Sequence, residues 1–227
     1  MAKILALDTS TDACSVALWL DGNIYEDFRI IPRQHTRELL PMVSALLAAH
    51  ELKVTDLDAI AFGRGPGSFA GIRIATGTAQ GLAFAAELPM LPVSTLAAMA
   101  LKAYQQDGLD QVASALDARM NEIYAGVYTF EHGLPVELLP ERVCAPAELT
   151  LPESVTQAVG SGFNYLEDLS STLQSQLTDV KKDCYPAAGA MVAIAAADWA
   201  QGRSVSADQA MPVYLRDEVA WKKKDQQ

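Results

Sequence analysis

The chain has no long uninterrupted apolar run and only three cysteines. Half of its 227 residues are apolar, yet no run approaches the roughly 20 residues that a membrane-spanning helix needs. The few apolar residues before Asp8 are too short a stretch for a signal peptide. Cys14, Cys144 and Cys184 are scattered and odd in number, which favours a reducing cytoplasm over a disulfide framework. We therefore expect a cytoplasmic protein that does not associate with membranes.

Positive charge is also scarce. The 17 Lys and Arg residues face 28 Asp and Glu residues, which gives a net charge of −11. A protein that grips nucleic acid by its phosphates normally carries a basic face, so we expect this chain alone to bind RNA weakly or not at all. The basic run Lys222, Lys223 and Lys224 is interpreted first as a solvated tail, with a local contact inside a larger complex as the alternative.

The glycines are concentrated in one informative loop. Residues 61–73 contain four glycines and join an apolar run, residues 57–62, to a helix expected over residues 72–86. Glycines there supply positive φ angles and let another backbone approach closely. The loop has neither G-x-G-x-x-G nor the Gly-Lys-Ser/Thr of a P-loop. It either cradles a phosphate or lets neighbouring elements pack tightly, and the loop alone favours neither.

The pattern of strands and helices predicts an α/β protein with a duplicated lobe. The dipeptide Asp107-Gly108 marks the expected boundary, which gives lobes over residues 1–106 and 107–227. Each half begins with a strand–turn–strand–turn–strand series, so we expect two diverged β-β-β-α-β-α lobes. The tail around residues 212–216 is expected to be extended and to dock on the body. The expected strands cover residues 4–7, 14–20, 24–30, 57–62, 90–93, 112–116, 122–130, 136–139 and 155–159, and the helices residues 36–50, 72–86, 95–105 and 189–201.

Four segments carry a resemblance to a known family. They are Leu5-Ala6-Leu7-Asp8-Thr9-Ser10, Gly63-Arg64-Gly65-Pro66-Gly67-Ser68-Phe69-Ala70-Gly71-Ile72-Arg73, Pro92-Val93-Ser94-Thr95-Leu96 and Asp117-Ala118-Arg119. Through them the chain resembles, over nearly its full length, the bacterial TsaB family, also called YeaZ. The resemblance implies a two-lobe actin-like (ribonuclease H-like) fold.

The resemblance also implies a non-catalytic scaffold or activating subunit. Its partners would be the catalytic relative TsaD and the ATPase TsaE, in a complex that transfers a threonylcarbamoyl group to N6 of adenosine 37 in tRNAs reading codons that begin with A. The chain would meet tRNA only through this complex, and it would form a homodimer when alone. Two alternatives stay open: an ATP-dependent small-molecule enzyme of the actin-like class, and a protease, as older glycoprotease labels suggest.

This chain lacks the two histidine ligands that the catalytic relative TsaD uses to bind a metal ion. TsaD carries two metal-binding histidines four residues apart on the helix after Pro-Val, where this chain has Thr95 and Met99. Neither side chain replaces imidazole as a ligand, and His35, His50 and His132 are far apart in sequence. We therefore expect no metal site and no catalytic residue.

Two turns are candidates for a remnant of the nucleotide site. In actin-like ATPases two hairpin turns, one in each lobe, hold the phosphates. The first turn here keeps Asp8 and Ser10, which either bind a phosphate or only cap a tight turn. The second, residues 117–121, has no glycine to bring backbone N–H groups close. Asp117 and Arg119 can instead pair with each other or with a partner, so we expect no cofactor.

Two helices carry the predicted partner-binding surface. On the helix over residues 72–86, small residues at spacing four form a stripe, and Gly77 with Gly81 forms a second small pair. Small faces let another helix approach closely, although such a stripe is often core packing. Two helices meeting two from TsaD or from a second copy would make a four-helix bundle. The predicted surface comprises Leu39, Val43, Leu46, Gly71, Ala75, Thr78, Ala79 and Leu82.

Overall fold

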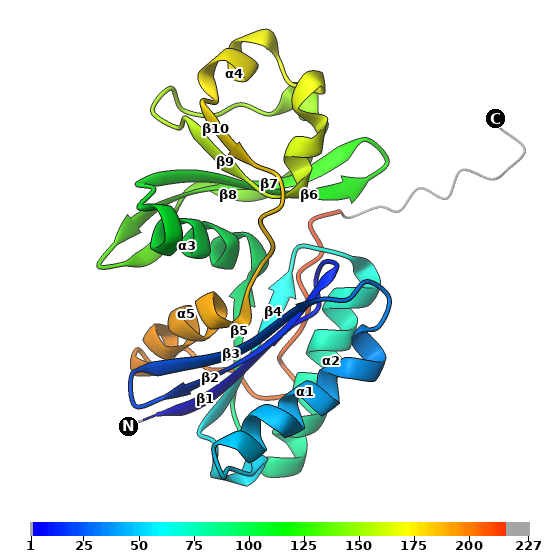
Figure 1. The fold of residues 1–227 in the computed structure, drawn as a ribbon, viewed down its shortest axis with the longest axis vertical. Helices are drawn as coiled ribbons and strands as arrows, with labels where there is room; N and C mark the ends of the chain where they lie inside the picture. Colours follow the sequence, from blue (N-terminus) through cyan, green and yellow to red (C-terminus); the bar gives the residue numbers. More distant parts are fainter. Residues whose placement is uncertain (1, 217–227) are drawn as a thin grey trace, which may run out of the picture.

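The first of two sheets forms the base of the N-terminal lobe. The computed structural model describes residues 2–216, and its first sheet has the strand order β3-β2-β1-β4-β5 (Figure 1). β1 pairs antiparallel with β2 and parallel with β4, so the β1–β2–β3 meander continues into a parallel half. The strands are β1 (Lys3–Asp8), β2 (Ala13–Leu20), β3 (Asn23–Ile30), β4 (Ala59–Gly65) and β5 (Met90–Ser94).

The second sheet repeats this topology. Its order is β8-β7-β6-β9-β10, with β6 antiparallel to β7 and parallel to β9. The strands are β6 (Gln111–Arg119), β7 (Glu122–Glu131), β8 (Leu134–Cys144), β9 (Gln157–Val159) and β10 (Asp179–Lys181). The matching order and directions confirm the duplicated two-lobe α/β fold. The second copy departs from it at two places. A single turn, η2 (Pro146–Glu148), stands where the first lobe has its first helix, and η3 (Ser161–Asp168) with the short α4 (Ser171–Gln176) stands where the first lobe has its second helix.

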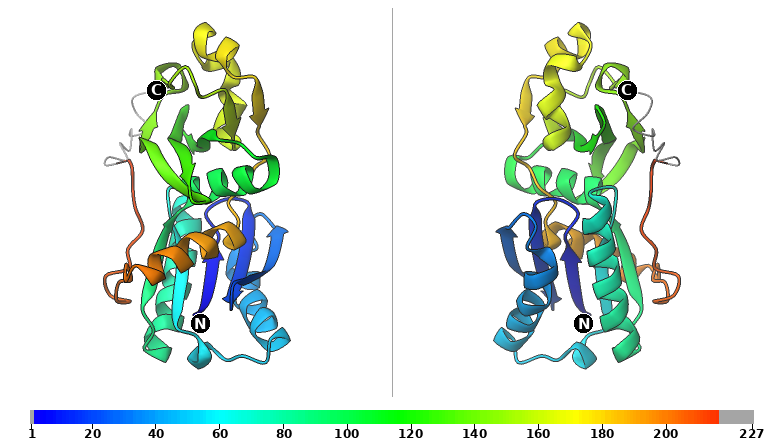
Figure 2. Two further views of the ribbon diagram at one scale, coloured as in Figure 1. Left: turned by 90° about the vertical axis from the view of Figure 1, so that its left-hand side faces the viewer. Right: turned by 90° about the vertical axis from the view of Figure 1, so that its right-hand side faces the viewer.

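Helices cover both faces of the first sheet. The two central strands carry uninterrupted apolar runs, Ile4–Leu7 in β1 and Ala59–Phe62 in β4, because each face of the sheet is covered there. Helices α1 and α2 cover one face and α5 the other (Figures 1 and 2). The helices are α1 (His35–Ala49), α2 (Phe69–Ala86), α3 (Thr95–Asp107), α4 (Ser171–Gln176) and α5 (Ala188–Ala200), with the short turns η1 (Val54–Asp56) and η3 (Ser161–Asp168). No helix within residues 2–216 is long and apolar enough to cross a membrane.

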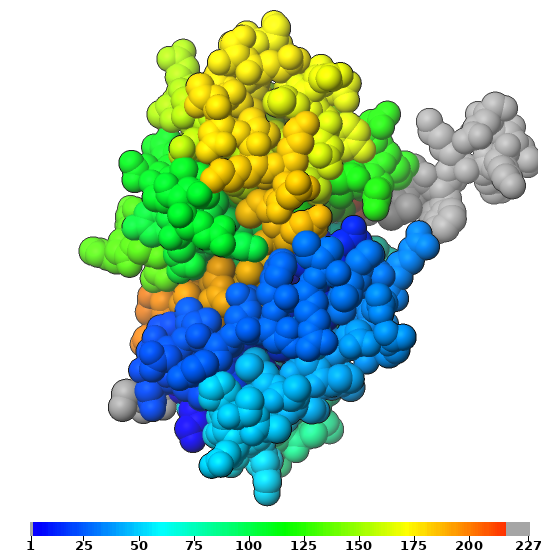
Figure 3. All heavy atoms as spheres, viewed as in Figure 1, coloured from blue at the N-terminus to red at the C-terminus, as the bar shows by residue number. Residues whose placement is uncertain are grey.

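The last helix of each lobe packs across the joint between the lobes. Leu96 and Met99 of α3 lie in one core cluster with Val112 and Leu116 of β6. Reciprocally, α5 is apolar on nearly all sides and packs on the first sheet. A division at residue 106 therefore separates the two sheets. Helix α5 comes after this division in the sequence, but it packs against the first lobe. In the space-filling view the blue first lobe and the green-to-gold second lobe meet along a broad contact (Figure 3).

The chain then returns along the first lobe as an extended segment. Val205 pairs with Met90 through two backbone hydrogen bonds of 2.8 and 2.9 Å, and the Val213 N–H donates to the Arg64 carbonyl at 2.8 Å. We call residues 203–216 the strap. Figure 2 shows it rising along one side of the molecule toward the second lobe. The run Lys222 to Lys224 lies outside the described residues.

Candidate functional site

The first hairpin turn holds a buried carboxylate. Asp8 ends β1 with no exposed surface, and its Oδ1 accepts hydrogen bonds from the Ser10 N–H at 3.0 Å and the Ser10 hydroxyl at 2.8 Å. Its Oδ2 has no hydrogen-bond partner within the described chain. Burial raises the pKa of Asp8 to about 6, and the two hydrogen bonds from Ser10 oppose that rise. The structure therefore brings Asp8 and Ser10 together, with Ser10 capping the carboxylate.

The glycine loop wraps directly around this turn. A Cβ on Gly63 would lie 2.0 Å from Asp8 Oδ2, and one on Gly71 would lie 2.0 Å from the Thr9 carbonyl oxygen. The Thr9 hydroxyl donates to the Gly71 carbonyl at 2.6 Å. Side chains at these positions would collide with the hairpin, so the glycines serve tight packing. Of the two roles left open for the loop, this geometry favours packing over a phosphate cradle.

In the second turn, the Asp117 side chain is paired with Arg119 of the same turn. Asp117 accepts a hydrogen bond from the Arg119 N–H at 2.7 Å and forms an ion pair with the Arg119 guanidinium at 3.1 Å. Arg119, Met120 and Asn121 all have positive φ, between 57° and 64°. Of the two roles considered for Asp117 and Arg119, the structure thus shows the pairing with each other.

Three backbone donors, at the two turns and at the start of α5, are already bound to carboxylates of the chain. The Ser10 N–H is bound to Asp8 and the Arg119 N–H to Asp117. At the start of α5, the Gly189 N–H donates to a carboxylate oxygen of Glu26 at 2.8 Å. Carboxylates of the chain thus occupy the places where an anion would be recognised. The residues present do not fit a nucleotide phosphate.

The two positions aligned with metal ligands are part of the core. The Thr95 hydroxyl donates to the Pro66 carbonyl, and the Met99 methyl group fills the space beside Gly160. Within residues 2–216, no group of three or more His, Cys, Asp and Glu side chains could hold a metal ion. His35 Nε2 lies 3.2 Å from the Ala13 carbonyl and His50 packs on Tyr25, so these two histidines have packing partners instead. Metal ligation is not supported by any of these side chains.

A polar cluster that the sequence did not indicate joins the lobes. Glu141 of β8, whose side chain is 7% exposed, accepts hydrogen bonds from the Ser94 hydroxyl and, at 2.6 Å, from the Tyr128 hydroxyl. Its other oxygen lies 3.8 Å from the Arg64 guanidinium of β4. Burial, and next the nearby Glu141 charge, raise the pKa of Tyr128. Because Glu141 sits in a strand of mixed polarity, no spacing rule marks it out in advance.

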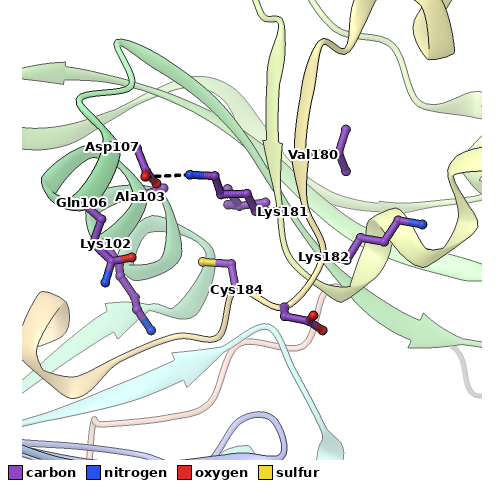
Figure 4. A pocket seen from close by; sticks show the side chains of 10 residues that line it. Lys102, Ala103, Gln106, Asp107, Val180, Lys181, Lys182 and Cys184 are labelled. Carbon is purple, nitrogen blue, oxygen red and sulfur yellow. Dashed lines mark ion pairs between the residues drawn. The ribbon is translucent and has the colours of Figure 1, made fainter.

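A pocket of ≈ 560 Å³ lies between α3 and the segment that follows β10. In Figure 4 the Lys181 amine points at Asp107, with which it pairs at 2.6 Å, while Lys102 and Lys182 point away in different directions. Lys102 donates to the Tyr185 carbonyl at 3.3 Å. A ligand site normally has polar groups that converge on one point, and these side chains do not converge.

The predicted partner surface divides into a buried and an accessible part. Five of its residues have almost no exposed surface and pack between the helices and the first sheet: Leu39, Val43, Gly71, Ala75 and Ala79. In the chain alone these five residues face the interior: Gly71 lets α2 sit directly on the Thr9 backbone, and the other four belong to the core beneath the two helices. Leu46, Thr78 and Leu82 are half-buried, so they remain available to a partner.

The outward face of α2 carries a different stripe. Phe69, Arg73, Gly77, Gly81 and Phe84 are all exposed and lie at spacings of three or four. A Cβ on Gly77 or Gly81 would find nothing within 4 Å, and the Phe84 side chain is 81% exposed. Glycine inside a helix costs about 1 kcal/mol relative to alanine, and no atom within residues 2–216 requires it at these two positions. In the sequence, the small pair Gly77 and Gly81 marks this outward face, whereas the predicted surface follows the stripe Gly71, Ala75 and Ala79, which faces inward.

Comparison with known proteins identifies the family. Residues 29–224 match the family model described as TsaD: tRNA N6-adenosine threonylcarbamoyltransferase. The tRNA threonylcarbamoyladenosine biosynthesis protein TsaB of Escherichia coli (strain K12) is 46% identical, over 97% of both chains. The chain belongs to the TsaB (YeaZ) family. The TsaB protein of Haemophilus influenzae is 40% identical, over 97% of this chain and 96% of its own.

A solved TsaB-family structure agrees with the fold. YeaZ from Pseudomonas aeruginosa superimposes with a TM-score of 0.89 at 42% identity, and the match covers 95% of this chain and 100% of that one. A second structure from the same organism, described as an uncharacterized protein with similarity to peptidase YEAZ, gives a TM-score of 0.90. The family resemblance and the two-lobe actin-like fold expected from the sequence are both confirmed.

Proposed function

We propose that this chain acts in tRNA threonylcarbamoyladenosine biosynthesis as a non-catalytic subunit that binds a TsaD-type protein through the outward face of α2. The names of its TsaB relatives support the pathway. The observation that carries the binding surface is the exposed stripe with Gly77 and Gly81 at its centre and Phe84 at its end.

The stripe has the shape that a crossing helix requires. Gly77 and Gly81 lie four residues apart on the outside of α2, where the lack of side chains lets a second helix come close. Phe69 and Phe84 lie on either side of the two glycines along α2, and both side chains are exposed. Exposed aromatic and arginine side chains, here including Arg73, are the residue types that dominate protein–protein binding energy.

A TsaD-type partner fits this surface because the family model for TsaD itself matches residues 29–224. A relative with the same topology presents an equivalent pair of helices, and two pairs can close into a four-helix bundle. The same face would serve a homodimer when the partner is absent. TsaE and tRNA would be met through the assembled complex, since the chain's net charge is −11.

A supporting role rather than catalysis is favoured by the state of the two hairpin turns. The phosphate-facing donors are bound to Asp8, Asp117 and Glu26. Burial raises the pKa of Cys14 to about 12, so this thiol is not a nucleophile at neutral pH. The ATP-dependent enzyme and the protease therefore receive no support from the described residues.

The test substitutes two exposed residues of the stripe and leaves the core residues unchanged. Phe84→Ser removes an exposed ring, and Gly81→Leu places a bulky side chain into open space. Each variant should be at least as stable as the parent and bind the TsaD-type protein at least about tenfold more weakly, as loss of a dominant interface contact does. Threonylcarbamoyladenosine formation in a reconstituted reaction should fall in parallel. Val136→Ser, which changes an exposed apolar residue on β8 of the other lobe, is the matched control.

Calorimetric titration of the purified TsaD-type protein into each variant gives the dissociation constants. Unchanged affinity in both stripe variants would show that this face is not the binding surface. Equal weakening in the Val136→Ser control would show that the loss is not specific to α2.

A further inference from the structure

The strap connects the outward face of α2 with the second lobe. Along its length, the Gln80 side-chain amide of α2 donates to the carbonyls of Ala207 and Ala210 at 3.0 and 2.8 Å. The Val213 N–H holds the strap to the end of β4. These contacts fix residues 203–216 on the first lobe while leaving their outer side uncovered.

Near Phe69, Tyr214 of the strap packs beside the exposed side chains of α2. The Arg73 guanidinium stacks on the Phe69 ring at 3.6 Å from its centroid and donates to the Tyr214 hydroxyl at 2.8 Å. The Phe69 and Tyr214 rings lie 5.9 Å apart. Tyr214 is 43% exposed and the neighbouring Met211 62%. A protein that covers the outward face of α2 here would touch the strap as well.

Two residues further on, the strap holds the second lobe. The Arg216 guanidinium donates to the carbonyls of Ala118 and Arg119 at 3.2 and 3.4 Å and forms an ion pair with Glu122. Its side chain is only 18% exposed. These acceptors flank the β6–β7 turn, because Ala118 and Arg119 end β6 and Glu122 begins β7. Arg216 thus joins the first lobe, through the strap, to a turn of the second.

That turn needs to be held in place. Arg119, Met120 and Asn121 are three consecutive non-glycine residues with positive φ, a conformation that L-residues rarely adopt even singly. Such a backbone persists only when its surroundings determine it. The Asp117 carboxylate holds the turn from within, and Arg216 holds it from the strap. The turn is therefore an element that can relax when one of these supports is withdrawn.

We propose that the strap is a latch between the lobes, which a protein bound to the outward face of α2 releases through Arg73, Tyr214 and Arg216. A partner carboxylate or carbonyl that takes the Arg73 donors removes the hydrogen bond to Tyr214. The end of the strap then loosens, and Arg216 leaves the turn. The release step rests on the proposed function, whereas the latch itself does not.

The latch is tested on the full chain without a partner. In Arg216→Ala, amide hydrogen exchange measured by mass spectrometry should become about tenfold faster in peptides covering residues 117–123, because the local opening costs less, and stay unchanged in β1. Arg203→Ala is the matched control, since Arg203 lies on the same segment but pairs with Asp198 of the first lobe. Glu122→Gln, which keeps the side-chain shape, should show a smaller acceleration in the same peptides. Unchanged exchange in the Arg216→Ala turn, or equal acceleration in Arg203→Ala, would overturn the latch.

Release is tested with the TsaD-type protein bound. Binding should accelerate exchange of residues 117–123 in the parent chain. In Tyr214→Phe, which keeps the ring but lacks the hydroxyl, the turn should already exchange faster before binding and change little on binding. If the partner binds and exchange in the parent turn is unchanged or slower, release is wrong and the proposed function stands. If the partner does not bind the parent chain at all, the proposed function and the release step fail together, and the result for Arg216→Ala still decides the latch.

Discussion

Three glycines of α2 allow a sharp test, because the same Gly→Ala substitution should lower stability at one position and raise it at the other two. A Cβ on Gly71 would lie 2.0 Å from the Thr9 carbonyl oxygen and 3.0 Å from its carbon. Both are backbone atoms, so the helix and the hairpin must move apart. A Cβ on Gly77 or Gly81 meets nothing within 4 Å. Gly71→Ala should therefore destabilise the chain, while Gly77→Ala and Gly81→Ala should stabilise it.

The magnitudes follow from these contacts. Overpacking in a rigid core costs typically 1–3 kcal/mol and occasionally more, and with backbone on both sides of the clash we expect about 3 kcal/mol for Gly71→Ala. Replacing an unconstrained helical glycine with alanine gains about 1 kcal/mol per site. For a chain of this length, each 1 kcal/mol corresponds to a shift of roughly 2–4 °C in the melting temperature.

The assay is urea unfolding followed by circular dichroism at two protein concentrations. The double variant Gly77→Ala, Gly81→Ala should unfold at higher urea than the parent in dilute solution. If the outward face also mediates self-association, this gain should shrink as concentration rises, because the parent alone profits from the contact. A double variant less stable than the parent in dilute solution would refute the view that these glycines serve something outside the chain. A Gly71→Ala variant of unchanged stability would refute the packing role of the loop.

Two further predictions concern charge. Burial raises the pKa of folded Asp8 from 3.8 to about 6, so ionisation of this carboxyl opposes folding. The stability contributed by the protonated carboxyl is present below about pH 4 and is lost as pH rises through 6. The difference in unfolding free energy between Asp8→Asn and the parent should therefore shift in favour of the variant by about 3 kcal/mol between pH 3.5 and pH 7, and a pH-independent difference in urea titrations would contradict this. With a net charge of −11, the chain alone should not bind tRNA at micromolar concentrations in physiological salt; a gel shift showing such binding would refute it.

The family and the order of elements could be read from the sequence because both depend on local signals. Apolar runs between turn residues predicted the meander of the first lobe, and the repeat of that pattern after Gly108 predicted the second sheet. The glycine loop around Gly63 and the Asp8 turn carried the resemblance that the comparisons confirm. The second lobe was predicted less fully: its β8 extends to Cys144, beyond the residues expected, and its first helix is only a turn.

The direction in which each side chain faces was decided by the tertiary structure alone. α2 is small on several sides, so periodicity could not show that Ala75 and Ala79 face the sheet while Gly77 and Gly81 face outward. The Glu141 cluster and the contacts of Arg216 join residues far apart in the chain, and no spacing rule links such residues. The sequence determined the order of most elements and which residue types stand at the two hairpin turns, because these follow from residue type and local order. Only the folded chain decided which surface is free to bind, because burial depends on what other segments cover.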